Sequence, residues 1–545
     1  MTRRRAALAA AAVAVLGVLV AFGLVALMRA TDPTPTVALG PPRFEDQTSS
    51  SGLDHVYDGD FPFAVGGGVA VLDCNGDGKP DLYLAGGANP AALYRNDTPV
   101  GGDLKFTRIA DPTTDLVDVL GAYPIDFDGD GITDLVVLRR GQSLLLHGLG
   151  DCRFSPWLSL GGPNDWTNAF SATWEAPSGM PTLALGHYLA LGADGQPDPS
   201  YSCADNLLYR PNAGGATYSD AVRLAPGYCS LSMLFSDWDR SGRRDLRITN
   251  DRQYYVGGQD QLWRMDAGSP PRLYTDADGW VALQIWGMGI ASFDLNGKGY
   301  PDVFLTSQGD NKLQTLAVGP GQPTYRDMAL RKGVTAAQPF TGGDVHASTA
   351  WHPEFEDVNN DGFIDLFVSK GNVSSEPDYA SRDPSDLFIG QPDGTFKESA
   401  DVAGVLNFAR GRGAALADFA MDGRLDLVEA NYGQPVRVWR NVGVPGGSAG
   451  HWLGIRLQQP GGNRDAIGAW IEVQVGKTIL RRELQIGGGH AGGQLGWTHF
   501  GLGPASDVHV RVQWPDGETG PWLSTKANQF VVLDRSSGQL QAWQP

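Results

Sequence analysis

Short acidic loops with a fixed spacing recur along this chain of 545 residues. Three copies follow the pattern D-x-[DN]-x-D-G-x-x-D without loss, and they begin at Asp73, Asp126 and Asp357. Side-chain oxygens at positions 1, 3, 5 and 9 of such a loop, turned inward by the Gly at position 6, suit Ca2+, which takes about 6–8 oxygen ligands. Zinc and copper prefer His or Cys ligands, and Mg2+ tolerates flexible loops poorly. The pattern therefore predicts calcium sites with a structural role.

Three further copies of the loop are partial. Ser241 at position 5 of the Asp237 loop predicts a weaker site, and Ala420 removes one ligand from the Asp418 loop. In the Asp294 loop, Lys298 places a cation where an acid belongs, so we expect a Lys–Asp ion pair there in place of a metal. The predicted calcium ligands are Asp73, Asn75, Asp77, Asp81, Asp126, Asp128, Asp130, Asp134, Asp237, Asp239, Asp245, Asp357, Asn359, Asp361, Asp365, Asp418, Asp422 and Asp426.

An ordinary turn rich in Asp, Asn and Gly is the alternative interpretation of each loop. Three complete copies, each between two apolar runs and in one phase of a repeat, favour calcium binding. The chain lacks the G-x-S-x-G, P-loop and H-E-x-x-H motifs, and His346 and His352 have no third ligand at a metal-site spacing. We therefore do not expect an enzyme, and the alternative is a propeller hydrolase or lyase that acts on an extracellular polymer.

The loops belong to a longer repeat of roughly 50–60 residues. A seventh copy without the acids lies around Trp174, inside the one wide gap between loops. Each unit has four short apolar runs, as in VAVLD, DLYLAG, AALYRN and KFTRIAD, which predicts an all-β, seven-bladed β-propeller over residues 44–445. The last unit lacks its fourth run, and residues 44–48 match that run, so we expect them to complete the last blade.

Residues 446–545 follow the repeats and alternate apolar and polar positions in short runs separated by Gly, which predicts a small β-domain. The segments GGGVAVLDCNGDGKPDLYL and GRGAALADFAMDGRLDL resemble FG-GAP/VCBS repeats, as in integrin α-subunit propellers and the cartilage acidic protein family. The last hundred residues resemble an ASPIC/UnbV domain in four ordered motifs, at 463–469, 487–489, 499–503 and 514–517. The resemblance implies a propeller followed by a domain without established chemistry.

The N-terminus predicts export. Residues 1–5 carry three arginines and precede an uncharged apolar stretch over 6–28, long enough at about 1.5 Å per residue to span a bilayer core of roughly 30 Å. We predict an uncleaved transmembrane signal anchor with residues 1–5 in the cytoplasm, and a cleaved signal peptide is the alternative. Residues 29–43 form a Pro-rich linker. The protein is thus expected in the cell membrane as a single-pass protein, with its C-terminal bulk extracytoplasmic, or secreted if the signal is cleaved.

Charge and cysteines narrow the functional class. A formal net charge of -19 excludes a nucleic-acid groove, which needs a basic surface. Four cysteines in an exported chain predict disulfides, and three pairings are possible. Cys203–Cys229 closes the shortest sensible loop, which leaves Cys74–Cys152. The expected function is a calcium-binding, adhesion-type module for an unidentified protein or glycan at the cell surface, in contact with the membrane through the N-terminal helix only.

Overall fold

The computed structural model describes residues 33–175, 179–212, 217–251, 258–281, 283–335, 349–373, 383–446 and 450–545. The predicted anchor over 6–28 and the predicted loop histidine His346 lie outside these ranges. Among the described residues, no helix is long and apolar enough to cross a membrane.

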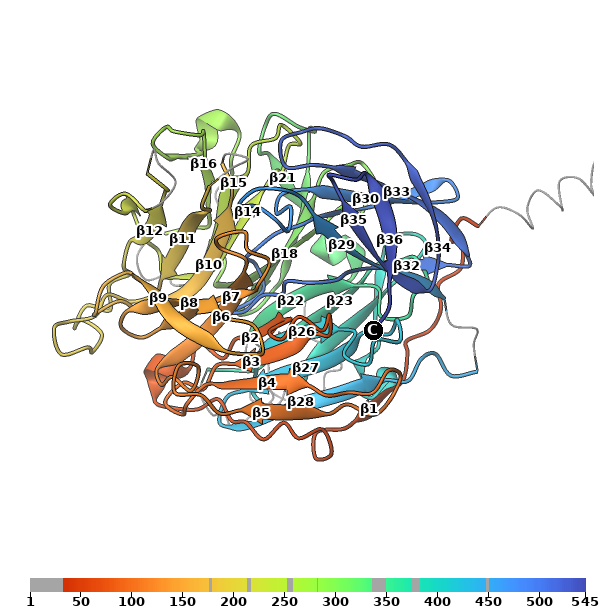
Figure 1. Ribbon diagram of the computed structural model, residues 1–545. Coiled ribbons are helices and arrows are strands. Elements are labelled where there is room, and N and C mark those ends of the chain that lie inside the picture. Colours follow the sequence, from red (N-terminus) through yellow and green to blue (C-terminus); the bar gives the residue numbers. More distant parts are fainter. Residues whose placement is uncertain are drawn as a thin grey trace, which may run out of the picture.

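Strand pairing divides the described residues into nine four-stranded sheets, of which seven are formed by residues 44–441 (Figure 1). The first two contain β2 (Val69–Leu72), β3 (Asp81–Leu84), β4 (Ala92–Asn96) and β5 (Phe106–Ile109), then β6 (Val119–Ile125), β7 (Asp134–Arg139), β8 (Ser143–Gly148) and β9 (Phe154–Leu160). The next two contain β10 (Thr167–Thr173), β11 (Thr182–His187), β12 (Asn206–Tyr209) and β13 (Val222–Leu224), then β14 (Ser230–Ser236), β15 (Asp245–Asn250), β16 (Gln261–Arg264) and β17 (Arg272–Leu273).

The remaining three of these sheets follow the same order. They contain β18 (Gly287–Phe293), β19 (Asp302–Ser307), β20 (Lys312–Leu316) and β21 (Tyr325–Asp327), then β22 (Ala350–Glu356), β23 (Asp365–Lys370), β24 (Asp386–Gly390) and β25 (Phe396–Glu398), and finally β26 (Gly411–Ala417), β27 (Asp426–Asn431), β28 (Gln434–Asn441) and β1 (Phe44–Asp46). Within the described ranges, four short helices connect strands: η1 (Phe61–Phe63), η2 (Asp276–Asp278), α3 (Ala329–Lys332) and α4 (Ala400–Ala403).

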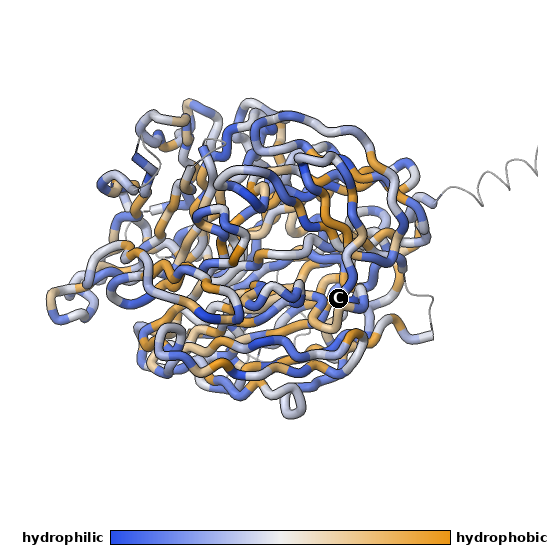
Figure 2. Tube along the Cα trace, viewed as in Figure 1, coloured by the Kyte–Doolittle hydropathy of each residue, from blue (hydrophilic) through white to orange (hydrophobic). Residues whose placement is uncertain are grey.

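The inner strands of the seven sheets form a closed, propeller-like ring. Each of β2, β6, β10, β14, β18, β22 and β26 contacts the next, and β26 contacts β2. These strands are almost completely buried because each lies between its neighbours, and most of their residues are apolar or small (Figure 2). β22, with His352, Glu354 and Glu356, is the main exception. The repeat that lacks acids forms the sheet β10–β13 like the other units.

The predicted closing strand is confirmed. β1 pairs antiparallel with β28, with Phe44 opposite Asn441 and Asp46 opposite Trp439. Phe44 is buried in a cluster with Val405, Leu427 and Trp439. The first and last parts of the ring are therefore joined in one sheet, which removes an exposed edge.

The last hundred residues form two sheets that enclose a separate apolar core. One contains β29 (His451–Gln458), β32 (Thr498–Gly503), β35 (Gln529–Asp534) and β36 (Gln539–Trp543), and the other β30 (Trp470–Val475), β31 (Thr478–Glu483), β33 (Asp507–Gln513) and β34 (Leu523–Lys526). The predicted small β-domain is thus present, and its blue strands lie together beside the ring in Figure 1.

Two segments fill the centre of the ring. Residues 486–494 run past the inner strands and form bridges with β2, β6, β10, β14 and β18. From the other side, the segment around η1 enters: Arg412 of β26 donates to the Ala64 carbonyl, and Asn168 of β10 lies against the Val65 carbonyl. His490 belongs to the first segment and is fully buried, with its ring against Trp351.

Both disulfides form as the sequence suggested. Cys203 pairs with Cys229, and Cys74 pairs with Cys152. The second bridge joins the Asp73 loop to the turn between β8 and β9, so it links two neighbouring sheets. Its sulfurs lie beside Asp81 but are not free thiols for metal binding.

Replacing Phe44 by Ala should destabilise the ring, because the closing strand loses its buried anchor. We expect a loss of about 3 kcal/mol, as for other buried Phe residues, seen as a lower midpoint of guanidinium unfolding. The matched control is Phe408→Ala, since Phe408 is 48% exposed and should change stability by less than about 0.5 kcal/mol. Equal effects of the two variants would contradict the closing role of β1.

Candidate metal centre

The six acidic loops occupy equivalent places in their sheets. Each joins an inner strand to the second strand, and its position-9 aspartate is the first residue of that second strand, as Asp81 is of β3 and Asp365 of β23. The position-6 glycines have positive φ, +81° at Gly78 and +86° at Gly362, which a residue with a side chain adopts with strain. The predicted tight turn is therefore present.

Backbone donors orient the acids in the same way in each loop. The Gly78 N–H donates to Asp73 Oδ2 at 2.9 Å, and the Gly362 N–H donates to Asp357 Oδ2 at 2.7 Å. The position-9 aspartate accepts one bond from the start of its loop and another from the end of the third strand, as Asp81 does from Cys74 and Asn96. The carboxylates are thus held in place before any ion binds, with their negative charge uncompensated by these neutral donors.

The Asp357 loop is the most deeply buried of the set. Asp357, Asp361 and Asp365 are each at most 4% exposed, and none forms an ion pair with a described Lys, Arg or His. Burial, and for Asp357 and Asp365 also the neighbouring carboxylates, raises the pKa of all three, to about 6 for Asp361. The linker covers this loop, because Leu39 N–H donates to Asp361 Oδ2 at 2.7 Å. A bound dication would supply the counter-charge that these three buried carboxylates lack.

The other two complete loops also gather acids. In the Asp126 loop, ligand atoms of Asp126, Asp128 and Asp130 lie within 4.8 Å of one another. Burial and then the nearby Asp465 raise the pKa of Asp126 to about 7. In the Asp73 loop, burial raises the pKa of Asp81 to about 8.

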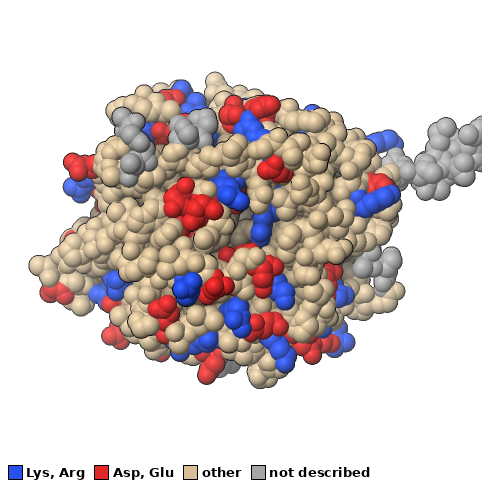
Figure 3. All heavy atoms as spheres, in the orientation of Figure 1, with Lys and Arg blue, Asp and Glu red and all other residues tan. Residues whose placement is uncertain are grey.

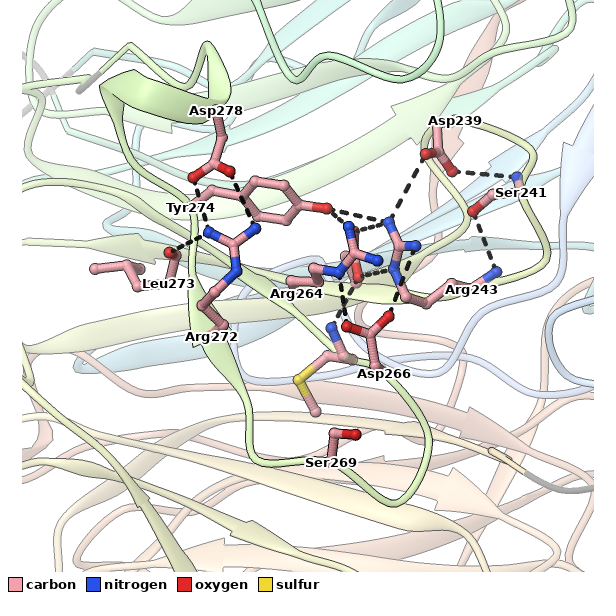
Figure 4. A network of polar contacts seen from close by, with 12 residues as sticks. Asp239, Ser241, Arg243, Arg264, Asp266, Ser269, Arg272, Leu273, Tyr274 and Asp278 are labelled. Atoms are coloured by element: carbon pink, nitrogen blue, oxygen red, sulfur yellow. Dashed lines mark hydrogen bonds and ion pairs between the residues drawn. The ribbon is translucent and has the colours of Figure 1, made fainter.

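The Asp237 loop carries its own cation. The Arg243 guanidinium lies 2.7 Å from Asp245 Oδ1 and 3.8 Å from Asp239 Oδ2 (Figure 4). Tyr274 Oη also donates to Asp245 Oδ2, at 2.8 Å. Arg243 therefore competes for the carboxylates that a metal would need. Lys79 occupies the same position in the Asp73 loop but donates to the Thr98 carbonyl, so the sequence alone does not indicate this pairing.

The predicted ion pair of Lys298 is wrong. Lys298 makes no ion pair among the described residues, and Arg481 of β31 instead lies 3.3 Å from Asp294 Oδ2. Lys298 is exposed and stays hydrated without a partner. Asp294 is buried and needs a nearby positive charge, which Arg481 provides. In the Asp418 loop, Arg424 pairs with Asp422, while Asp418 and Asp426 stay buried without an ion pair.

Family models match the chain in both of its parts. The model described as FG-GAP-like repeat matches residues 73–137 and 357–429, and the model described as ASPIC and UnbV matches residues 459–540. The chain contains FG-GAP-like repeats and an ASPIC and UnbV domain.

Curated relatives agree with this assignment. Cartilage acidic protein 1 of Mus musculus is 27% identical over 238 residues, which cover 40% of this chain and 33% of that protein. The Homo sapiens protein is 26% identical over 238 residues, which cover 40% and 32%. The matched region is thus about a third of these relatives' length. Among solved structures, that of BBS1N in complex with ARL6DN has a TM-score of 0.44 at 9% identity, covering 75% of this chain and 99% of that one.

The ASPIC and UnbV domain lies directly on the acidic loops of the FG-GAP-like repeats. Trp497 Nε1 donates to the Gly78 carbonyl at 2.8 Å, Glu483 accepts from Asp237 N–H at 2.8 Å, and Gly503 N–H donates to the Asn360 carbonyl at 2.9 Å. Arg456 lies 3.7 Å from Asp73 Oδ2. These residues were not predictable from the sequence, because no local pattern relates a loop to a residue hundreds of positions away.

Without calcium, stability should fall as pH rises. The folded pKa is raised to about 7 for Asp126 and Asp418, so the folded state holds protons there that the unfolded state has lost above its pKa of about 3.9. We expect a higher melting temperature at about pH 5.5 than at about pH 8 in a chelator, measured by calorimetry.

The matched control for this pH dependence is the same scan in excess calcium. A bound dication favours the ionised carboxylates, so the gain at low pH should shrink or reverse. A higher melting temperature at pH 8 in the chelator would contradict the assignment of uncompensated acids.

Proposed function

We propose that this protein is an exported, membrane-anchored, calcium-binding propeller of seven blades that acts as a binding module for a protein or glycan at the cell surface. The observation that carries the proposal is the position of the acidic loops between the blades and the ASPIC and UnbV domain. An ion bound in such a loop can stabilise both the blade and the contact with the domain that covers it.

The complete loops are the proposed calcium sites. Asp357, Asp361 and Asp365, with Asn359, offer side-chain oxygens, and the three acids have no ion pair among the described residues. In the other two complete loops, Arg456 lies 3.7 Å from Asp73 and His147 lies 3.0 Å from Asp134. A bound Ca2+ would neutralise carboxylates that otherwise repel one another across a few ångströms. The Asp418 loop is a weaker candidate and the Asp237 loop the weakest, because Arg424 and Arg243 already pair with their acids.

Calcium would also favour docking of the ASPIC and UnbV domain. Gly501 lies so close to Asp357 that a Cβ there would clash with the Asp357 carboxylate, and His499 Nε2 lies 2.6 Å from Asn360 Oδ1. A repelling set of acids would move the loop beneath these contacts, whereas a bound ion would fix it. Domain docking therefore depends on the same charge balance as blade stability.

A binding role is supported by the filled centre of the ring. Propeller enzymes need an open funnel for their substrate, and here residues 486–494 and the segment around η1 fill the axis from its two sides. At the centre, His490 N–H donates to His352 Nδ1 at 3.1 Å. The outer surface and the edge of the domain interface are then the surfaces for a partner.

Calcium removal should lower the melting temperature. A calorimetric scan with EGTA is compared with one in excess calcium and one in magnesium alone, and only calcium should give the higher value. The double variant Asp357→Asn and Asp361→Asn should lose part of this shift, whereas Asp239→Asn, in the loop with its own arginine, should retain it. An unchanged melting temperature in EGTA would contradict the calcium proposal.

Chelation should also expose residues 486–494. These residues bridge five inner strands, so their amides exchange slowly while the domain is docked. We expect faster hydrogen exchange there in EGTA than in calcium. The control is the segment 529–534, which lies in β35 within the domain's own sheet and should exchange equally in both conditions. Equal protection of 486–494 with and without calcium would show that docking does not depend on the ion.

A further inference from the structure

The second strand of the sheet β22–β25 ends in a buried lysine. Lys370 is the last residue of β23, and its side chain is 2% exposed. None of the other six sheets of the ring has a lysine at the end of its second strand, where the residues are Leu84, Arg139, His187, Asn250, Ser307 and Asn431. The fold of the sheet therefore does not require a lysine here.

Two aspartates lie beside this lysine. Asp383 forms an ion pair with Lys370 Nζ, and Asp386 Oδ2 lies 3.6 Å from the same nitrogen. Both aspartate side chains are fully buried. Nζ is itself shielded from solvent, and among the described residues no hydrogen bond of acceptable geometry reaches it. One amine and two carboxyl groups thus meet in a site that excludes water.

This arrangement differs from an ion pair at the surface. Figure 3 shows lysine and arginine side chains close to acidic ones on the visible face, where water screens their charges. Lys312 and Asp327 form a partly exposed pair of this kind, with a separation of 3.3 Å. Lys370 and its two aspartates have no such contact with water, so three charges at this place would be costly.

The backbone around the three groups is fixed. Ser385 Oγ accepts from the Lys370 N–H at 3.1 Å, which ties the end of β23 to the start of β24. On the other side of the lysine, the Gly371 carbonyl accepts from Arg412 Nη1 at 3.0 Å. Reacting groups that are held in the correct geometry behave as if at concentrations of about 10⁵–10⁸ M. The amine and the carboxyl group beside it are therefore placed to react with each other.

We propose that Lys370 and Asp383 are joined by an intramolecular isopeptide bond, and that Asp386 transfers the protons. The Lys370 ammonium first gives a proton to the Asp383 carboxylate, so that an amine meets a carboxylic acid. The Nζ lone pair then adds to Asp383 Cγ, and the bond from Cγ to the hydroxyl oxygen breaks. Asp386 accepts the proton that Nζ loses and delivers it to the departing hydroxyl, which leaves as water. One amide and one water form from one amine and one acid, and Asp386 returns to its initial state.

The bond would close the connection between β23 and β24 covalently. An amide is neutral, so the charges of Lys370 and Asp383 no longer have to be desolvated. Lys370 ends β23, whereas Asp365 of the proposed calcium loop begins it, so the two sites lie at opposite ends of one strand. The cross-link is therefore separate from the calcium sites and goes beyond the proposed binding function.

Tryptic peptide mapping of the full chain, after denaturation and reduction, tests the proposal. Trypsin cleaves after free lysine and arginine, so a chain without the bond gives peptides 333–370, 371–382 and 383–397. The isopeptide bond blocks cleavage after Lys370 and joins peptide 333–382 to peptide 383–397. We expect this joined peptide, with a mass one water molecule below the sum of the two. Recovery of the three separate peptides without it would overturn the proposal and leave a buried ion pair only.

Variants separate the roles of the three residues. Lys370→Met should abolish the joined peptide, and Asp383→Asn should still give one of the same mass as the wild type, because ammonia then leaves in place of water. Asp386→Asn keeps both reacting groups and should slow formation of the joined peptide by about a hundredfold or more, since general acid–base catalysis contributes about 10²–10⁴-fold. The matched control is Asp327→Asn, because Asp327 pairs with the partly exposed Lys312 and should leave the joined peptide unchanged.

A joined peptide in Lys370→Met would overturn the assignment of the bond, and an unchanged rate in Asp386→Asn would overturn the role of Asp386. The wild-type map needs no variant, so the proposal is tested even if a variant does not fold. The map is made on denatured protein without regard to calcium, so its failure would leave the calcium-dependent melting shift intact.

Discussion

The negative charge buried between the blades and the C-terminal domain is the constraint on which the rest of the structure depends. The Asp357 loop concentrates it: three aspartates, each at most 4% exposed, lie under the strand that contains Gly501 and Gly503. Burial of one uncompensated carboxylate already costs several kcal/mol, and mutual repulsion adds to this. Neither the blade nor the docked domain is stable unless this charge is protonated, paired or bound to a cation.

The buried loop carboxylates receive positive charge from two different sources, although the loops have the same backbone conformation. In the Asp237 loop, Arg243 supplies the cation from within the loop, and in the Asp294 loop Arg481 supplies it from the C-terminal domain. The turn is the same in both, since Gly242 and Gly299 have φ of +84° and +86° and donate to the first aspartate of their loops. The loop conformation is therefore independent of the source of positive charge. Repeats can lose the loop acids without losing the four-stranded sheet, and the sheet β10–β13 is the extreme case.

Patterns within short sequence segments predicted the features that depend on neighbouring residues, namely the strands and the loop turns. The alternation of short apolar runs indicated four strands per unit, and the unmatched run at Phe44 indicated the closing strand β1. The loop glycines were also predictable, because only a residue without a side chain adopts their φ without strain. The position of the C-terminal domain was not predictable. Its contacts join residues hundreds of positions apart, and the error on Lys298 arose because Arg481 came from that domain.

Close approach of backbone explains why the Gly-rich segment, rather than a helix or a bulky loop, fills the ring. A Cβ at Gly68 or at Gly121 would clash with the Ala491 carbonyl oxygen, so β2 and β6 must be small where this segment crosses them. Six blades also have apolar, hydroxyl or small residues at the positions that face the domain, whereas β22 has His352, Glu354 and Glu356. Packing alone would favour the first kind of strand, since ionisable groups at an interface cost desolvation. The exception in one blade is explained by the docked domain itself, because His490 N–H, Gln494 and Arg482 of that domain contact His352, Glu354 and Glu356 in turn.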